Sequence, residues 1–278
     1  MTEHWLYGGL VRLAFDEKAH KYLVSVNGRE GEEWPSVTSL LSLLDKSGPL
    51  VGWSLKEAAK YVDKRLKKER VEGFSAGSHV WTADDDGIQS LCDGLKRAPR
   101  SKKEWAADVG TQAHAWIEAH IKAQLELTEQ PELPTDKWIR QACESFLKWE
   151  DFENVKYLAS ERRVASLDYR YVGTMDQLIQ LNGKLTVLDT KASNAIYPEY
   201  HLQAAAYAAA VEEEDDCSIE QHVIVRISKD GPEVEAQLIE YTDEARRLMG
   251  TVAHLATLYG SLNGAKGFIA EATKSWKL

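Results

Sequence analysis

The stretch that decides the fold runs from Gly173 to Lys191 and reads GTMDQLIQLNGKLTVLDTK. Its Asn182-Gly183 pair lies between two apolar-rich runs. That arrangement is the strongest short signal for a β-hairpin, because both turn residues must accept positive φ. If these two residues form the loop, the strands pair so that Asp176 faces Asp189, with Cβ atoms roughly 5 Å apart. The sequence therefore predicts two carboxylates side by side on neighbouring strands.

Two facing carboxylates repel each other and destabilise the strand pair. A divalent cation would turn that cost into a binding site, because hard cations prefer carboxylate oxygens. Lys191 lies two residues after Asp189, so its side chain points to the same face of the strand. Two acids and a lysine around a metal can cleave a phosphodiester. The alternative is a pair of surface acids and a solvated lysine on an edge hairpin.

Composition limits the class of protein. The chain has 278 residues, of which 44% are hydrophobic, enough for one large domain or two small ones. Its apolar runs are too short to span a membrane, and its start does not resemble a secretory signal, so we expect a cytoplasmic protein. The three cysteines, Cys92, Cys143 and Cys217, form neither a metal-ligand spacing nor a disulfide framework.

The charge balance argues against a general nucleic-acid binder. The chain has 34 Lys and Arg against 44 Asp and Glu, a formal net charge of −10. Contacts to phosphate dominate the affinity of proteins for nucleic acids. Only the local potential matters at a cleft, however, so the net charge does not exclude a DNA substrate.

The hydrophobic pattern predicts an α/β protein with a mixed central sheet, flanking helices and a helical N-terminal part. A hairpin is expected over residues 9–26, and a poorly patterned loop or short helices over 71–100. Helices are expected from Pro35-Ser36 to Leu44, broken at Gly48-Pro49, and over 51–70, 101–127, 134–150, 199–213 and from Thr242 to about Leu262. Strands are expected over 155–167, 170–181, 184–192, 221–228 and 234–241.

Two pairs of residues at helical spacing are further candidates. His114 and Glu118 are four residues apart and share one face of the long helix. An imidazole nitrogen can complete a carboxylate metal site, although a lone helical histidine is more often structural. Gln203 and Tyr207 have the same spacing on the alanine-rich helix. Helix packing explains this second pair as well as a bond to phosphate or to a ligating carboxylate would.

Two basic runs and one acidic run remain. The basic runs, 64–70 and 96–103, are either solvated helix ends or DNA contacts. The acidic run Glu212–Asp216 is expected to be a solvated helix end.

Together these motifs resemble the PD-(D/E)XK nuclease superfamily, in particular its RecB-like and mitochondrial genome maintenance exonuclease branch, which includes many phage exonucleases. The N-terminal Pro35–Leu41 and Trp53 are similar to the opening of that branch. The resemblance covers about residues 20 to 210. The motifs that carry it are Gly110-Thr111 with His114 and Glu118, then Glu161, Gly173-Thr174 with Asp176, Asp189 with Lys191, and Gln203 with Tyr207.

The resemblance implies a restriction-endonuclease-like core that depends on one or two Mg²⁺ or Mn²⁺ ions. Carried over, His114, Asp176, Asp189 and the carbonyl of Thr190 are metal ligands, and Lys191 orients or activates the attacking water. Glu118, Glu161, Gln203 and Tyr207 would support the site or bind DNA. The second acid is Asp189 where Glu is more usual, and no proline precedes Asp176.

The expected function is therefore a metal-dependent DNA exonuclease acting on ends or single strands in recombination, repair or replication. The alternative is a non-catalytic DNA-binding protein or a structural subunit of a recombination complex. Partners would be DNA, a single-strand annealing or other recombination protein, and further copies of the chain. We expect residues 1–105 to form an N-terminal hairpin and helical region, and residues 106–278 to form the nuclease core.

Overall fold

The computed structural model describes residues 2–16, 19, 21–29, 31–44, 47–73, 85–228 and 231–274. The chain divides into two compact units, one made of residues 1–43 and 112–278 and the other of residues 44–111. The predicted division into residues 1–105 and residues 106–278 stays a prediction.

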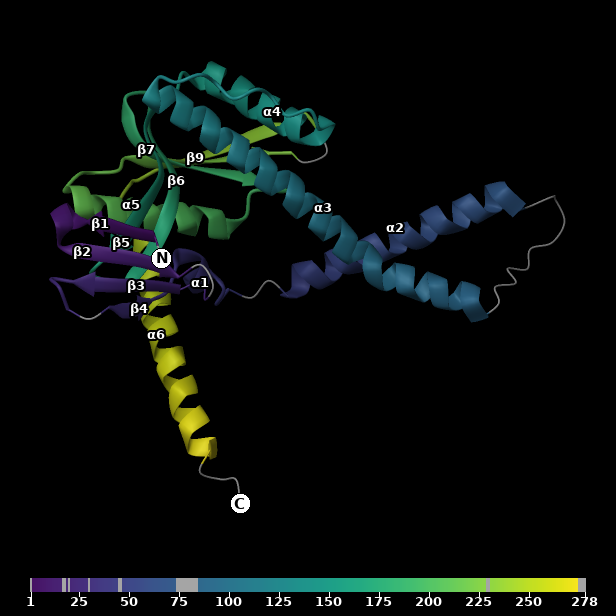
Figure 1. Cartoon of the computed structure of the whole chain (residues 1–278), viewed down its shortest axis with the longest axis horizontal. Coiled ribbons are helices and arrows are strands. Elements are labelled where there is room, and N and C mark those ends of the chain that lie inside the picture. The colour runs from purple at the N-terminus through teal and green to yellow at the C-terminus, as the bar shows by residue number, and fades with distance from the viewer. Residues whose placement is uncertain are drawn as a thin grey trace. The chain divides into compact units, whose positions relative to one another are not determined.

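Two sheets and several helices make up the chain (Figure 1). The strands are β1 (Thr2–Leu6), β2 (Val11–Asp16), β3 (Lys21–Val26), β4 (Glu32–Trp34), β5 (Lys156–Ser166), β6 (Tyr171–Leu181), β7 (Lys184–Ala192), β8 (Gln221–Ile227) and β9 (Val234–Glu240). The helices are α1 (Val37–Leu41), α2 (Ser47–Gly73), α3 (Asp85–Glu126), α4 (Lys137–Glu153), α5 (Pro198–Asp215) and α6 (Arg247–Lys274), and a 3₁₀ turn covers Tyr7–Gly9.

The larger sheet has the order β5-β6-β7-β8-β9. Neighbouring strands in this sheet are antiparallel except β7 and β8, which are parallel and are connected by α5. Helix α5 is buried through its alanines and packs against β5, β8 and α6. This mixed, helix-flanked sheet confirms the predicted restriction-endonuclease-like class.

The β6–β7 hairpin forms as its turn residues dictate. Asn182 has φ 52° and Gly183 has φ 80°, so both occupy the left-handed region. Gln177 pairs with Leu188 and Leu181 with Lys184, which confirms the predicted register. The hairpin thus brings Asp176 on β6 and Asp189 on β7 close to each other.

The N-terminal hairpin belongs to a four-stranded antiparallel sheet, β1-β2-β3-β4, of which the sequence indicated only the middle pair. One face of this sheet packs on β5 and β6 through buried residues that include Leu13, Val24 and Trp34. The Val172 amide also donates to the Pro35 carbonyl at 3.0 Å. The small sheet therefore covers part of the larger one.

Helix α3 differs from its prediction. Residues 85–100, expected to be a loop or short helices, are helical and continuous with the predicted segment, with Pro99 inside the helix. A Cβ atom at Gly94 would collide with the hydroxyl of Tyr61 on α2, so the two helices approach each other closely at this point. Pro99 does not end the helix, although proline locally disfavours a helix interior. Residues 74–84 of the predicted loop lie outside the described residues.

Two helix starts also differ. Gly48-Pro49 lies in the first turn of α2, where proline is tolerated, and not between two helices. The Thr242 hydroxyl accepts from the Ala245 amide at 3.3 Å, but only turns follow, and α6 begins at Arg247 and continues beyond Leu262.

The acidic run is the end of α5, as predicted, and Asp215 and Asp216 are exposed, but Glu212–Glu214 are half-buried. Glu213 accepts hydrogen bonds from the Leu167 amide at 2.7 Å and the Ser166 hydroxyl at 2.8 Å. Asp215 accepts two hydrogen bonds from Arg162, at 2.5 and 2.6 Å. These acids therefore connect α5 to β5 and to the turn that follows it.

No helix in the described part of the chain is both long and apolar enough to cross a membrane. The three cysteines are free thiols.

Candidate active site

Three carboxylates form a row across β5, β6 and β7. Continuing the hairpin register by one residue places Asp189 opposite Asp176. The pairs Ser160–Gln177 and Arg162–Met175 on β5 and β6 place Glu161 opposite Asp176 on its other side. Glu161 itself has φ 50°, an uncommon conformation for a residue other than glycine that often marks a functional site. The sequence predicted the Asp176–Asp189 half of this row.

Lys191 is held by the buried acid of the row. Its Nζ lies 2.8 Å from Oδ1 and 2.7 Å from Oδ2 of Asp189, a side chain with no exposed surface. The same Nζ lies 5.5 Å from the centre of the Tyr200 ring on α5, a contact that the sequence did not reveal. The ammonium group therefore stands between the acids and α5, on the face predicted from its spacing.

His114 joins the row from α3. Its Nε2 lies 3.0 Å from Oδ2 of Asp176, and the Thr190 amide donates to the same oxygen at 3.1 Å. Ligand atoms of His114, Glu118 and Glu161 lie within 4.8 Å of one another. Glu118 also forms an ion pair with Lys122. The structure thus brings the predicted helical pair to the strand acids.

Tyr207 on α5 lies near enough to this centre to feel the charges of its acids, and Gln203 contacts Tyr207. The Gln203 side-chain amide donates to the Tyr207 hydroxyl at 2.9 Å. Burial raises the pKa of Tyr207, and the negative charges of Asp189 and Asp176 raise it further. Gly173 makes room for the ring, since a Cβ atom there would lie 2.5 Å from Tyr207 Cε1.

The site contains more negative charge than its cations neutralise. Burial raises the pKa of Asp189 to about 7 even though Lys191 opposes the shift, and the neighbouring Asp176 adds to it. Burial together with Asp176 and Glu118 raises the pKa of Glu161 to about 6. Burial has the largest single effect on the pKa of Asp176 and would raise it. The hydrogen bond from His114, the charges of Lys191 and His114 and the hydrogen bond from the Thr190 amide together lower that pKa. An added cation would relieve the repulsion.

The donors fit a hard divalent cation. Carboxylate oxygens are the preferred ligands of Mg²⁺ and suit Mn²⁺, and one imidazole is compatible with the latter. Glu161 Oε1 is buried and has no hydrogen-bond partner among the residues that the structure describes. A buried carboxylate oxygen without a partner is costly, and a metal ion would satisfy it.

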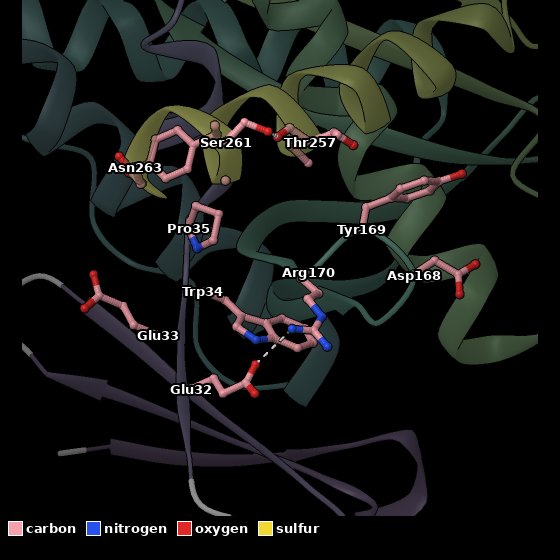
Figure 2. Close-up of a pocket in the computed structure, with 13 residues that line it drawn as sticks. Glu32, Glu33, Trp34, Pro35, Asp168, Tyr169, Arg170, Thr257, Ser261 and Asn263 are labelled. Atoms are coloured by element: carbon pink, nitrogen blue, oxygen red, sulfur yellow. Dashed lines mark hydrogen bonds and ion pairs between the residues drawn. The ribbon is translucent and has the colours of Figure 1, made fainter. Parts of the chain in front are cut away.

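The site is distinct from a pocket of about 530 Å³ beside α6, which none of the predicted site residues lines. Figure 2 shows its lining, in which Arg170 and Glu32 form an ion pair at 3.1 Å. The predicted centre therefore rests on its donor geometry and not on the presence of a deep cavity.

Comparisons with known proteins agree with this chemistry. A family model described as the PD-(D/E)XK nuclease superfamily matches residues 91–271. No curated protein matches the chain by sequence.

The chain also matches solved structures, with low sequence identity and low TM-scores. An alkaline exonuclease (LHK-Exo) from Laribacter hongkongensis is 11% identical, with a TM-score of 0.37, over 62% of this chain and 98% of that one. LHK-Exo in complex with dAMP is 14% identical, with a TM-score of 0.36, over the same shares. SSO0001 is 22% identical, with a TM-score of 0.26, over 43% of this chain and 57% of that one.

Proposed function

The chain belongs to the PD-(D/E)XK nuclease superfamily, and we propose that it is a divalent-metal-dependent deoxyribonuclease that degrades DNA from ends or single strands. The observation that carries the proposal is the row Glu161–Asp176–Asp189 with Lys191 bound to its buried acid. A family match alone would not distinguish an active enzyme from an inactive scaffold. The presence of every expected side chain in one place favours the enzyme.

Asp176, Asp189, His114 and the carbonyl of Thr190 would hold the metal. The oxygen donors among them suit both Mg²⁺ and Mn²⁺, and the imidazole favours Mn²⁺. The second donor group, His114 with Glu118 and Glu161, leaves room for one or two ions. The bound cation would supply a water of lowered pKa and a polarised phosphate.

The chain's own groups supply positioning and charge. Lys191 reaches over Asp189, where its ammonium group can hold the attacking water and neutralise charge that develops on the phosphate. His114 fixes the orientation of Asp176 through their hydrogen bond. Tyr207, held by Gln203, would support the site from α5. Such positioning is the main contribution of a protein to phosphoryl transfer.

The test is a nuclease assay on end-labelled linear DNA and covalently closed circles, titrated with Mg²⁺ and Mn²⁺. The proposal predicts degradation of linear DNA that requires the metal, and circles that stay intact. Circles cut as fast as linear DNA would replace the exonuclease with an endonuclease. The near-isosteric variant Asp176→Asn, checked for an unchanged melting temperature, serves as the inactive control.

Two rival functions give different results in the same assay. A DNA-binding protein on a nuclease scaffold would bind DNA and leave it intact at every metal concentration. A subunit that needs a partner would be inactive alone and become active when a single-strand annealing or other recombination protein is added. Assembly into homo-oligomers and a cytoplasmic location stay predictions.

A further inference from the structure

We propose that Arg163 binds the DNA phosphate next to the one that is cleaved, which makes it a substrate-positioning residue of the proposed nuclease site. This inference depends on the proposed function, because it assigns the phosphate to a DNA substrate. Arg163 lies on β5, where it pairs with Thr174 of β6. Thr174 in turn is two residues before Asp176 on the same strand.

The alternation of side chains places Arg163 on the face of the acidic row. Thr174 shares a face of β6 with Asp176 two residues later, and Arg163 is paired with Thr174 and donates to its hydroxyl, so Arg163 lies on that same face. The Arg163–Thr174 pair is thus the next row along the sheet, about 7 Å away by the rise of two strand residues. Successive phosphates of an extended DNA strand can span this separation.

The contacts of Arg163 leave its charge uncompensated. Its Nη1 donates to the Thr174 hydroxyl and lies 3.4 Å from the Tyr22 hydroxyl of β3. Both partners are neutral, and no carboxylate of the described residues lies within ion-pair distance of this guanidinium. Its neighbour Arg162, by contrast, is paired with both Asp215 and Glu214. The two adjacent arginines therefore differ: Arg162 forms structural ion pairs, and Arg163 can bind an anion.

The geometry of Arg163 suits phosphate in particular. A guanidinium offers five donors in a planar fork that matches the oxygens of phosphate. Arg163 is half-buried, and its two hydroxyl contacts both use Nη1. They hold the side chain in one orientation and leave the rest of the fork free of hydrogen bonds to the described residues. Lys191 has a different role, because its ammonium group is bound to Asp189 in the acidic row, where the proposal places the phosphate that is cleaved.

Binding measured against salt concentration separates a phosphate contact from a structural role. A short fluorescein-labelled single strand is titrated with metal-free full-length protein, and anisotropy gives the affinity between about 50 and 200 mM salt. For single strands the slope of log affinity against log salt is negative, and each phosphate contact adds about 0.7 to its magnitude. We expect Arg163→Gln to reduce the magnitude of this slope by about that amount, and Arg163→Lys to leave the slope unchanged.

Arg170→Gln is the matched control, because it removes an arginine whose charge is paired with Glu32. It should leave the slope unchanged. An unchanged slope in Arg163→Gln would overturn the inference, and so would a slope lost equally in Arg163→Lys, which keeps the charge. If the wild-type chain neither binds nor cleaves DNA, the proposed function fails as well. Wild-type cleavage with an unchanged Arg163→Gln slope would overturn only the role of Arg163.

Discussion

Replacing Gly173 by alanine tests whether close packing of Tyr207 sets the geometry of the site. The added Cβ atom would lie 2.5 Å from Cε1 and 3.3 Å from Cδ1 of the Tyr207 ring. Cβ atoms essentially never approach so closely, so something must move. The ring is rigid and only 4% exposed, and its hydroxyl accepts from Gln203. Either the ring or strand β6 must therefore shift. A shift of β6 at Gly173 would also move Asp176, which lies three residues later on the same strand.

The expected cost follows from overpacking. Inserting a methyl group into a well-packed core costs about 1–3 kcal/mol. Each kcal/mol corresponds to a fall in melting temperature of roughly 2–4 °C for a unit of this size. Activity should fall further than stability, because a displacement of about 1 Å near reacting groups can lower the rate about 100-fold.

Thermal unfolding and the rate of DNA degradation, measured on the same preparations, give the result. Gly250→Ala on α6 is the control, since no atom lies within 4 Å of its added Cβ. The decisive comparison repeats Gly173→Ala in a Tyr207→Ala background, where the collision no longer exists. We expect the cost of the glycine change to fall below about 0.5 kcal/mol there, the range of additivity for independent sites. An equal cost in both backgrounds would refute the packing argument.

Two further predictions concern charge. Lys191→Ala should lower the rate of DNA cleavage at least about 100-fold while metal-free DNA binding stays within about threefold, and near-normal cleavage would remove Lys191 from the mechanism. The second concerns the buried hydrogen bond between His120 and Glu150, which are 2.9 Å apart. Burial opposes both shifts. This bond and the charge of Glu150 are the main causes that nevertheless raise the pKa of His120 above 6.5, and the same bond helps to lower the pKa of Glu150 below 4.5. The histidine's stabilisation is complete below pH 6.5 and is lost as the pH rises through its raised pKa, and the glutamate's is complete above pH 4.5 and is lost as the pH falls through its lowered pKa. Melting temperatures should therefore exceed those of His120→Gln most between pH 4.5 and 6.5, and a difference that does not vary with pH would contradict this.

The hairpin could be predicted because its information is local. Asn182-Gly183 determines the turn, the turn determines the register, and the register places Asp176 beside Asp189. The helical spacings placed His114 and Tyr207 on helices but not near the acids. Their meeting depends on how α3 and α5 pack on the sheet, which no short pattern encodes. The resemblance to a family supplied that part of the prediction.

Glu161 and the acidic run show where sequence patterns fail. Glu161 is aligned with Asp176 only because β5 has an irregularity between Tyr157 and Ala159, which changes the register by one residue. Nothing in the strand's composition announces that irregularity. Likewise, the sequence around Glu213 and Asp215 is typical of a solvated helix end, and only the structure shows that β5 and its following turn bind these two side chains. The meaning of both depends on contacts between segments far apart in the chain.

The most direct test of the central claim is the rate at which end-labelled linear DNA is degraded as Mn²⁺ is raised from zero in the presence of a chelator. The claim predicts no cleavage without free metal, a saturable rise for the wild-type chain and no rise for Asp176→Asn. Cleavage that persists in excess chelator, or equal rates for the two proteins at every concentration, would contradict it.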